Sequence, residues 1–189
     1  HRHFRRQRQM CIRDRPRTEG EKKYDTATFY SISNCQEGLS RVTLGNFLIK
    51  RVVYEIQEEL PNIKNFGTLS PIPGFRDWFT TLDEKIIQNI LGKIPYSNVS
   101  FLKSTDLKVG DGRIVSNKHA IIKLVAHYLM NEKNKKGLPI NDVCRFHLGN
   151  GAIIDDININ ANVSEVGLNR SFGVMVNYLY ELKNIEKNH

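Results

Sequence analysis

Ser70 is well placed to do chemistry, because its hydroxyl follows an apolar run and precedes two prolines. The surrounding segment, Phe66–Phe75, reads FGTLSPIPGF. A residue before proline is pushed towards extended geometry. Proline cannot donate to a sheet ladder, so Pro71 and Pro73 mark the end of a strand. We therefore expect Ser70 at the carboxyl end of a strand, rigidly held, with its side chain facing a crevice.

His147 is the histidine whose position suggests acid–base or hydrogen-bond chemistry. It precedes the glycine-rich turn Gly149–Gly151, which would place it at the end of a short helix and facing a strand. A lone histidine is weak support for catalysis, and a structural role is the alternative. The other histidines are terminal or belong to a predicted helix, where a surface or core-edge role is expected: His1, His3, His119, His127 and His189.

The loop Asn34–Asn46 suggests an anion site. It is polar, contains Gly38 and Gly45, and feeds the start of a predicted helix. Such a loop offers free backbone N–H groups and the positive end of the helix dipole, where a pyrophosphate binds well. The alternative is an ordinary turn between a strand and a helix.

These residues require a strand–helix–strand unit to position them. Ala27–Ser33 is rich in aromatic and β-branched residues and predicts a strand. Leu44–Leu60 repeats apolar residues every four positions and predicts a helix, which Pro61 ends. Phe66–Ser70 predicts the next strand. Sheets with such crossovers bind ligands outside the carboxyl ends of their strands.

The rest of the chain predicts further helices and strands. The expected helices are Leu82–Leu91, Asn117–Asn131 and Asp142–Leu148, the expected strands are Ala152–Ile159 and Gly173–Leu182, and a loop is expected at Gly110–Gly112.

Composition indicates one globular domain. The 189 residues suffice to bury a core, and 40% apolar with 25% charged residues is ordinary. The sequence shows neither a run of about 18 apolar residues nor a signal-peptide pattern. Cys11, Cys35 and Cys144 are too few and too scattered for a disulfide framework or a zinc site, so we expect no metal and a reducing compartment.

The positive charge is concentrated at the start of the chain. Residues 1–17 hold seven arginines and one acid, so they carry six of the net +8 charges. The remainder is nearly neutral, which argues against a broad nucleic-acid-binding face. We expect residues 1–23 to be a non-homologous or disordered basic leader, with an assembly artefact or a true basic arm as the alternatives.

Three segments together resemble the catalytic domain of malonyl-CoA decarboxylases. They are the Ser-Pro-Ile-Pro-Gly-Phe run at Ser70, the Phe-His-Leu-Gly-Asn-Gly-Ala run at Phe146–Ala152, and the run Gln36–Lys50. The last is similar to the family's coenzyme A pyrophosphate loop, Gln-x-Gly-Leu-x-Gly-Val-x-Leu-Gly-x-Phe-Leu-Ile-Lys. The likeness covers about Thr26–His189, in which Ser164–Gly173 and Met175–Tyr180 resemble the family's closing strands.

The resemblance implies a fold and an activity. The fold would be α/β with a mixed (α+β) sheet, a partial GNAT-like acyl-CoA-binding fold with a helical insertion, over residues 24–189. The activity would be decarboxylation of malonyl-CoA to acetyl-CoA and carbon dioxide without metal or organic cofactor. By the same resemblance Ser70 orients the malonyl carboxylate, and His147 donates to the thioester oxygen or delivers the proton. Tyr180 would be a supporting donor or a core aromatic.

The resemblance also implies binding and cellular roles. The coenzyme A part of the substrate would be held by Ser40, Arg41, Val42, Thr43, Leu44, Gly45 and Asn46. The implied partners are malonyl-CoA, acetyl-CoA and further copies of the full-length enzyme, without nucleic acid or membrane. The implied setting is fatty acid metabolism in the cytoplasm, or in mitochondria or peroxisomes in a eukaryote.

Four positions depart from the family pattern. Arg41 stands where the family usually has glycine, and it could pair with a coenzyme A phosphate or crowd the loop. Asp156 and Ile159 stand where relatives tend to have arginine and tryptophan, and Asn162 replaces a common aspartate. These changes fit either a repacked strand or a changed wall of the active site.

Two other functions remain open from the sequence. An acyl-CoA N-acyltransferase of the same fold would need an acceptor site and a base, and Ser70 before proline supplies no base. A non-catalytic coenzyme A-binding fragment is the second, since relatives carry a helical domain and several strands before the one at Ala27–Ser33. That strand would then be an unpaired edge. For decarboxylation, Ser70 and His147 must face one pocket within about 10 Å.

Overall fold

The computed structural model describes residues 24–29, 45–104, 111–181 and 183–184, and only the backbone of 45–48. Its first elements are the predicted crossover. Strand β1 (Thr26–Phe29) is followed by helix α2 (Gly45–Glu59) and by strand β2 (Asn65–Thr68), and β1 pairs with β2 in parallel. The predicted parallel strand–helix–strand unit is therefore confirmed over the described residues, and positions 30–33 of the predicted strand Ala27–Ser33 lie outside them.

The strand that carries Ser70 is interrupted at Leu69. Strand β3 (Ser70–Pro71) and β2 both pair antiparallel with β5 (Met175–Leu179). The two pairings share one continuous register, since Gly67 lies opposite Leu179 and Ser70 lies opposite Val176. The backbone N–H of Leu69 donates instead to the carbonyl of Phe29 in β1, at 3.2 Å. Ser70 is not the last strand residue as predicted, because Pro71 still pairs with Met175.

Strand β4 (Ile153–Asn158) also pairs antiparallel with β5, with a bulge between Ile154 and Asp156. The strands predicted at Ala152–Ile159 and Gly173–Leu182 are thus confirmed, although both are shorter than expected. Within the described residues β1 pairs only with β2, so it is the edge strand that the sequence predicted.

Residue alternation gives the sheet one buried face. Every second residue of the paired strands β2, β3 and β5 is buried. These residues are Phe66, Thr68 and Ser70, which lie opposite Tyr180, Tyr178 and Val176. The intervening residues, such as Asn65, Gly67, Asn177 and Asp156, are exposed or half-buried. Because successive side chains of a strand point to opposite faces, the buried hydroxyls of Thr68 and Ser70 lie on the same face.

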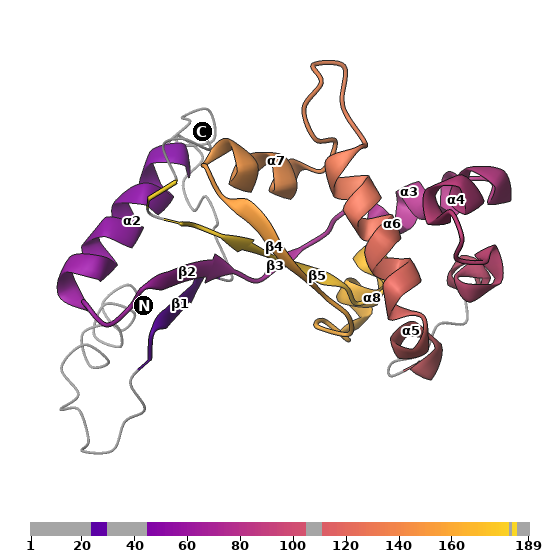
Figure 1. The fold of residues 1–189 in the computed structure, drawn as a ribbon, viewed down its shortest axis with the longest axis horizontal. Helices are drawn as coiled ribbons and strands as arrows, with labels where there is room; N and C mark the ends of the chain where they lie inside the picture. The colour runs from indigo at the N-terminus through magenta and orange to yellow at the C-terminus, as the bar shows by residue number, and fades with distance from the viewer. Residues whose placement is uncertain (1–23, 30–44, 105–110, 182, 185–189) are drawn as a thin grey trace, which may run out of the picture.

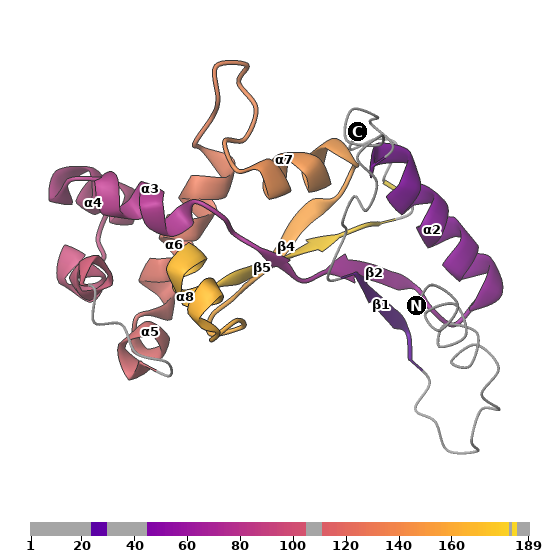
Figure 2. The same cartoon turned by 180° about the vertical axis from the view of Figure 1, so that it is seen from behind.

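The helices form two groups. Helix α2 lies at one end of the sheet, and the helical insertion lies at the other (Figures 1 and 2). The insertion consists of α3 (Phe75–Thr81), α4 (Glu84–Leu91), the 3₁₀ turns η2 (Tyr96–Asn98) and η3 (Ser100–Lys103), α5 (Gly112–Ser116) and α6 (Lys118–Met130). The helices predicted at Leu82–Leu91 and Asn117–Asn131 are confirmed, whereas α3 and α5 were not predicted. Of the predicted loop Gly110–Gly112, Gly110 lies outside the described residues and Gly112 instead begins α5.

Two helices follow the insertion. Helix α7 (Asp142–Gly149) confirms the helix predicted at Asp142–Leu148. Helix α8 (Glu165–Ser171) corrects the sequence interpretation, which took Ser164–Gly173 as a closing strand. The Ser164 side chain caps α8 by accepting from the N–H of Gly167, and Phe172 ends it in a left-handed conformation.

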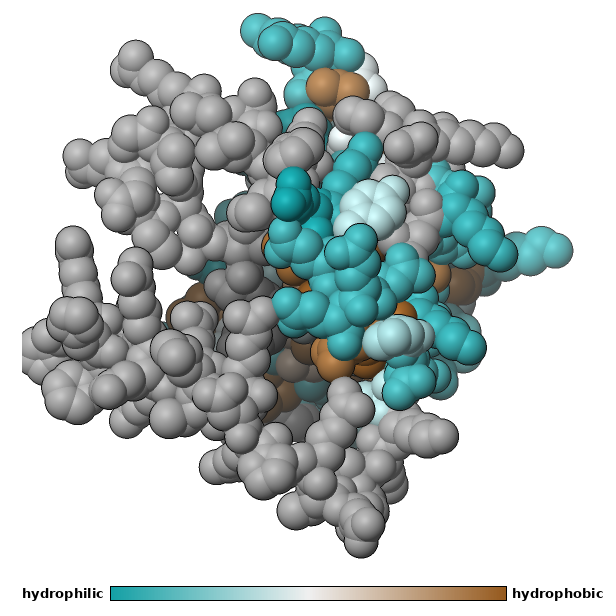
Figure 3. Space-filling model, turned by 90° about the vertical axis from the view of Figure 1, so that its left-hand side faces the viewer, coloured by the Kyte–Doolittle hydropathy of each residue, from teal (hydrophilic) through white to brown (hydrophobic). Residues whose placement is uncertain are grey.

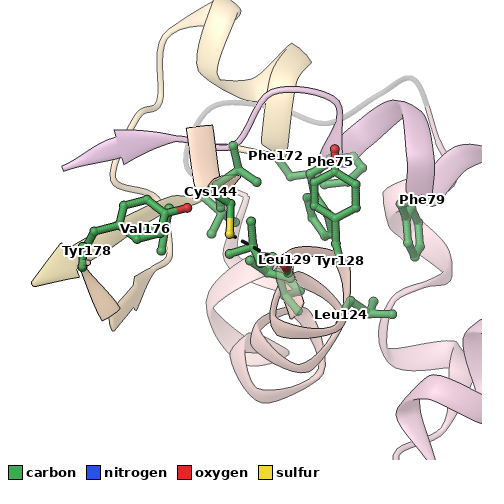
Figure 4. Packing of buried hydrophobic residues seen from close by; sticks show 14 of the residues in the cluster. Phe75, Phe79, Leu124, Tyr128, Leu129, Cys144, Phe172, Val176 and Tyr178 are labelled. Atoms are coloured by element: carbon green, nitrogen blue, oxygen red, sulfur yellow. Dashed lines mark hydrogen bonds between the residues drawn. The ribbon is translucent and has the colours of Figure 1, made fainter. Parts of the chain in front are cut away.

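The core joins the sheet to the insertion. Phe172 meets Phe75 and Phe79 edge-on, and Cys144 of α7 donates its thiol hydrogen to the Leu129 carbonyl of α6 (Figure 4). Viewed from the side of α2, the described surface is mainly hydrophilic, with hydrophobic residues visible beneath it (Figure 3). None of the described helices has both the length and the apolar character needed to span a membrane.

Candidate active site

Helix α7 holds His147 against the Ser70 segment. The Asn141 side chain caps α7 by accepting from the N–H of Cys144 at 2.8 Å, and it donates to the Pro73 carbonyl at 2.8 Å. Tyr128 of α6 donates to the same carbonyl at 3.1 Å. The carbonyl of Pro73 therefore holds both α6 and the start of α7 by hydrogen bonds.

The turn after α7 fixes the other side of His147. The backbone N–H groups of Asn150 and Ala152 both donate to the His147 carbonyl, each at 3.1 Å. The Asn150 side chain donates to the Phe146 carbonyl at 2.7 Å. The glycine-rich turn thus closes on His147 itself, which confirms the prediction that this histidine stands at a helix end facing a strand.

Ser70 and His147 form a direct contact. Ser70 Oγ lies 3.2 Å from His147 Nε2, and both residues are buried, with 6% and 5% of their surface exposed. Their separation is well within the limit of about 10 Å set by the prediction that both face one pocket. They form a serine–histidine pair on the buried face of the sheet.

Three aromatic rings surround the imidazole. Tyr178 stacks on it with ring centroids 4.5 Å apart and planes at 23°, and Phe146 meets it edge-on at 5.2 Å. Tyr180 approaches the opposite nitrogen, with its phenol oxygen 2.7 Å from Nδ1. Tyr180 fills both roles that the sequence left open, because its ring is buried in the hydrophobic core and its phenol is a hydrogen-bonding partner of His147.

Thr68 completes the network and was not foreseen from the sequence. Its Oγ1 accepts from Ser70 Oγ at 2.9 Å and from the N–H of Tyr178 at 3.2 Å. The signal was present in the spacing, because residues two apart in a strand share a face. The resulting order of contacts is Thr68, Ser70, His147 and Tyr180.

Burial sets the protonation of the imidazole and the phenol. Desolvation lowers the pKa of His147 to about 4 and raises the pKa of Tyr180 well above its ordinary value. Burial favours the neutral form of each group, because an uncompensated charge is costly in a low-dielectric interior. At neutral pH His147 is therefore an uncharged imidazole with one N–H to donate.

The predicted coenzyme A loop lies largely outside the described residues. Ser40, Arg41, Val42, Thr43 and Leu44 are not described, and Gly45 and Asn46 are described only as the first backbone positions of α2. Helix α2 packs against α7, and the start of α2 is drawn beside the end of α7 that carries His147 (Figure 1). Binding by these residues stays a prediction.

Of the four departures from the family pattern, Arg41 lies outside the described residues, and Asp156, Ile159 and Asn162 are described. Asp156 is exposed and pairs with Asn177, on the face of the sheet opposite to that of Tyr178. Ile159 packs against the core, and Asn162 accepts from the Ser164 hydroxyl at 2.6 Å. For Asp156 the structure favours a repacked strand over a changed wall.

Other candidate sites are weak. Within the described part of the chain, His, Cys, Asp and Glu side chains nowhere gather in threes as a metal site would require. An open hollow of about 760 Å³ lies over the start of α4, and its lining, Asp83, Glu84, Lys85, Gln88 and Asn89, shares no residue with the network around His147.

Comparison with known proteins decides the family. Residues 6–189 match the model of the malonyl-CoA decarboxylase C-terminal domain. The chain belongs to this family. The family membership that the motifs around Ser70 and His147 indicated is thereby confirmed.

Named relatives and solved structures agree. The chain is 39% identical over 189 residues to "Malonyl-CoA decarboxylase, mitochondrial" of Anser anser anser, covering 90% of this chain and 37% of the relative. With the protein of the same name from Rattus norvegicus it is 37% identical over 195 residues, covering 93% and 39%. The malonyl-CoA decarboxylase structure from Rhodopseudomonas palustris aligns with a TM-score of 0.74 at 42% identity, covering 87% of this chain and 38% of that one. That from Agrobacterium vitis gives 0.74 at 37% identity, covering 90% and 42%.

The chain spans about two fifths of the length of these malonyl-CoA decarboxylases. The mixed α/β sheet with a helical insertion is confirmed by the structure and by these neighbours. The more particular likeness to the GNAT acyltransferase fold stays a prediction.

Proposed function

We propose that this domain decarboxylates malonyl-CoA to acetyl-CoA and carbon dioxide. The observation that carries the proposal is the buried contact between Ser70 Oγ and His147 Nε2, within a chain of the malonyl-CoA decarboxylase family. The relatives that bear this name are longer than this chain, so their activity comes to it as a proposal.

The chemistry asks for control of two oxygens. The malonyl carboxylate must be held out of the plane of the thioester, so that the breaking bond overlaps the carbonyl. The carbonyl oxygen becomes an enolate as carbon dioxide leaves, and a preorganised donor to such an oxyanion contributes roughly 3–4 kcal/mol. The pair offers one hydrogen-bonding group for each of these oxygens.

Neutral His147 suits the enolate. Its Nε2–H, which meets Ser70 Oγ in the free site, can turn to the thioester oxygen while the Ser70 hydroxyl holds the carboxylate. An uncharged donor in a buried site is strengthened by the low dielectric and needs no counter-ion. The last step, protonation of the α-carbon, can use the hydrogen on Nε2 or that on Ser70 Oγ, and a proton from solvent then restores the group that gave it.

The proposed route uses no metal or organic cofactor, since hydrogen bonds hold both reacting oxygens. Coenzyme A is part of the substrate. We assign its pyrophosphate to Ser40–Asn46, before and at the start of the fifteen-residue helix α2, because a helix start presents the positive end of its dipole and N–H groups without intrahelical partners. Arg41→Gly should then change affinity for malonyl-CoA and acetyl-CoA alike and leave the chemical step nearly unaltered.

The cellular setting is a further part of the proposal. We assign the domain to fatty acid metabolism, where it would regulate malonyl-CoA, in a homo-oligomeric enzyme of the cytoplasm that binds neither nucleic acid nor membrane. The mitochondrial names of the curated relatives make mitochondria the first alternative compartment, ahead of peroxisomes.

The test is a product assay on malonyl-CoA. We expect equal amounts of carbon dioxide and acetyl-CoA, with turnover reduced about 10²-fold or more in Ser70→Ala. Coenzyme A binding should survive in this variant, because residues 40–46 are unchanged. An unchanged rate in Ser70→Ala would remove Ser70 from the mechanism. Transfer of an acyl group to an amine would favour the acyltransferase alternative, and binding without turnover would favour a non-catalytic module.

A further inference from the structure

The network around His147 has the order of contacts of a hydrolase triad. A serine oxygen lies 3.2 Å from Nε2, and a third group, the Tyr180 phenol, lies 2.7 Å from Nδ1. In serine hydrolases the third group is a carboxylate that accepts the Nδ1 hydrogen. Nε2 is then left with a lone pair that takes the serine proton. Here the third group is a phenol, which has a hydrogen of its own.

The contacts at both ends of the network place the imidazole hydrogen on Nε2. The Tyr180 phenol is 1% exposed, and its oxygen contacts Nδ1. Donation to Nδ1 satisfies both atoms, whereas a hydrogen on Nδ1 would leave the phenol hydrogen buried without that acceptor. At the other end Ser70 gives its hydrogen to Thr68, so Ser70 accepts from Nε2.

We propose that Tyr180 is a positioning residue that holds His147 as the Nε2–H tautomer and so prevents Ser70 from acting as an acyl acceptor. The inference rests on the proposed function for its thioester substrate. A histidine without a lone pair on Nε2 cannot take the serine proton. In serine proteases, loss of the carboxylate that sets the tautomer lowers turnover about 10⁴-fold. Tyr180 therefore decides between decarboxylation and hydrolysis.

The reaction that Tyr180 prevents is ordinary thioester hydrolysis. Ser70 Oγ would bond to the thioester carbon while Nε2 took the serine proton. The carbon–sulfur bond would break, and coenzyme A would leave as the thiol with that proton. Water would then cleave the serine ester, with Nε2 as base, to give malonate and free enzyme. No oxidant, metal or further reactant is needed.

Replacing the phenol by a carboxylate should reverse the roles. We choose Tyr180→Glu because glutamate has a longer side chain than aspartate. Its carboxylate can accept the hydrogen of Nδ1, which leaves the lone pair on Nε2. We expect carbon dioxide release to fall about 10²-fold and free coenzyme A thiol to rise about tenfold over the parent enzyme. The added thiol release should disappear in Tyr180→Glu with Ser70→Ala. Thiol release that survives this second change would overturn the role given to Ser70.

Tyr180→Phe is the matched control, because it keeps the ring and removes only the hydroxyl. We expect carbon dioxide release to fall about tenfold, because the tautomer is no longer fixed, with no gain in thiol release. Tyr180→Phe at the parent rate would overturn the proposal.

The tautomer itself can be read independently of activity. ¹⁵N NMR of imidazole-labelled protein at pH 7 should show the His147 hydrogen on Nε2 in the parent and a shift towards Nδ1 in Tyr180→Glu. A parent protein with the hydrogen on Nδ1 would overturn the inference even if Tyr180→Glu does not fold. A parent with the Nε2 hydrogen that releases no carbon dioxide would instead contradict the proposed function alone.

Discussion

Two histidines near the ends of helices differ in what surrounds them. His127 is in the last turn of α6, and His147 is in the last turn of α7. Each stacks on an aromatic ring, Trp78 for His127 and Tyr178 for His147. A helix end and an aromatic partner are therefore not what makes a histidine suitable for catalysis.

The difference lies in burial and in the third neighbour. The His127 side chain is 32% exposed, and its Nε2 lies 3.5 Å from the Glu132 carboxylate, so a charged imidazole would be paired and hydrated there. His147 is enclosed, and its nitrogens meet a hydroxyl and a phenol. The enclosed site keeps the imidazole neutral, as our proposal of a hydrogen-bond donor to the enolate requires.

The largest expected effect is on malonyl-CoA turnover, when the two histidines are replaced by asparagine one at a time. We expect His147→Asn to lower malonyl-CoA turnover about 10²-fold or more, because the donor to the enolate is lost. His127→Asn should stay within about twofold, because it lies outside the network. Steady-state assays of the two variants check the comparison, and equal turnover in both would remove His147 from the chemistry.

The next effect is the contribution of His147 to the pH dependence of stability. The pKa of His147 falls from 6.5 to about 4 on folding, so between these values the unfolded chain binds more protons than the folded one. Stability is then unaffected by this group above pH 6.5 and declines as pH falls towards 4. From pH 7 to pH 5 the loss should be about 2 kcal/mol.

Urea unfolding of the parent and of His147→Asn at the two pH values measures this contribution. The parent should lose more stability than His147→Asn by that amount. A parent and a His147→Asn variant with parallel pH profiles would show that the imidazole is not enclosed as described.

Removing the hydroxyl from each of two tyrosines near these helices should change stability by smaller amounts, and in opposite directions. The Tyr128 phenol donates to the Pro73 carbonyl, so Tyr128→Phe should cost about 1 kcal/mol. The Tyr178 phenol points towards the Cys144 thiol (Figure 4), a weak hydrogen-bonding group, and its buried oxygen has no stronger partner within the described residues. Tyr178→Phe should therefore be neutral or stabilise by up to about 1 kcal/mol. Thermal unfolding of both variants measures these changes. A large loss of stability in Tyr178→Phe would show that the Tyr178 phenol makes a strong hydrogen bond.

The smallest effect is expected for the basic leader. Removing residues 1–17 should change stability by less than about 0.5 kcal/mol and leave both histidine environments unaltered. Denaturant unfolding and the pH profile of the shortened chain are the measurements. A cooperative loss of stability would make the leader a structural element of the domain.

Ser70 and His147 could be predicted from the sequence, because two prolines and a glycine-rich turn mark strand and helix ends locally. Their contact was inferred by resemblance, and the network beyond them was only partly visible. Thr68 follows from the two-residue period of a strand, but the Tyr180 contact depends on long-range packing of β5 against α7. Sequence reasoning therefore left the role of Tyr180 open.

Helix α8 could not be predicted, because tertiary contacts override its local preferences. Gly167 sits mid-helix, where glycine is unfavourable. A Cβ there would lie 2.2 Å from the Asn162 carbonyl oxygen, so the crossing backbone requires glycine. Helix α3 likewise contains aromatic and β-branched residues typical of strands. It forms because the positive φ of Gly74 turns the chain and because Phe75 and Phe79, four apart, are buried together.

The shared register of β2 and β3 also determines where the chain tolerates changes in length. Adding or deleting one residue between Thr68 and Ser70 would turn one of the two hydroxyls to the opposite face of the sheet and away from His147. The hairpin that pairs Lys133 with Pro139 projects beyond α6 and α7 (Figure 1) and is free of this constraint. Natural variation in length, and any inserted tag, should therefore collect in the hairpin and be excluded from the two-residue step that aligns the hydroxyls.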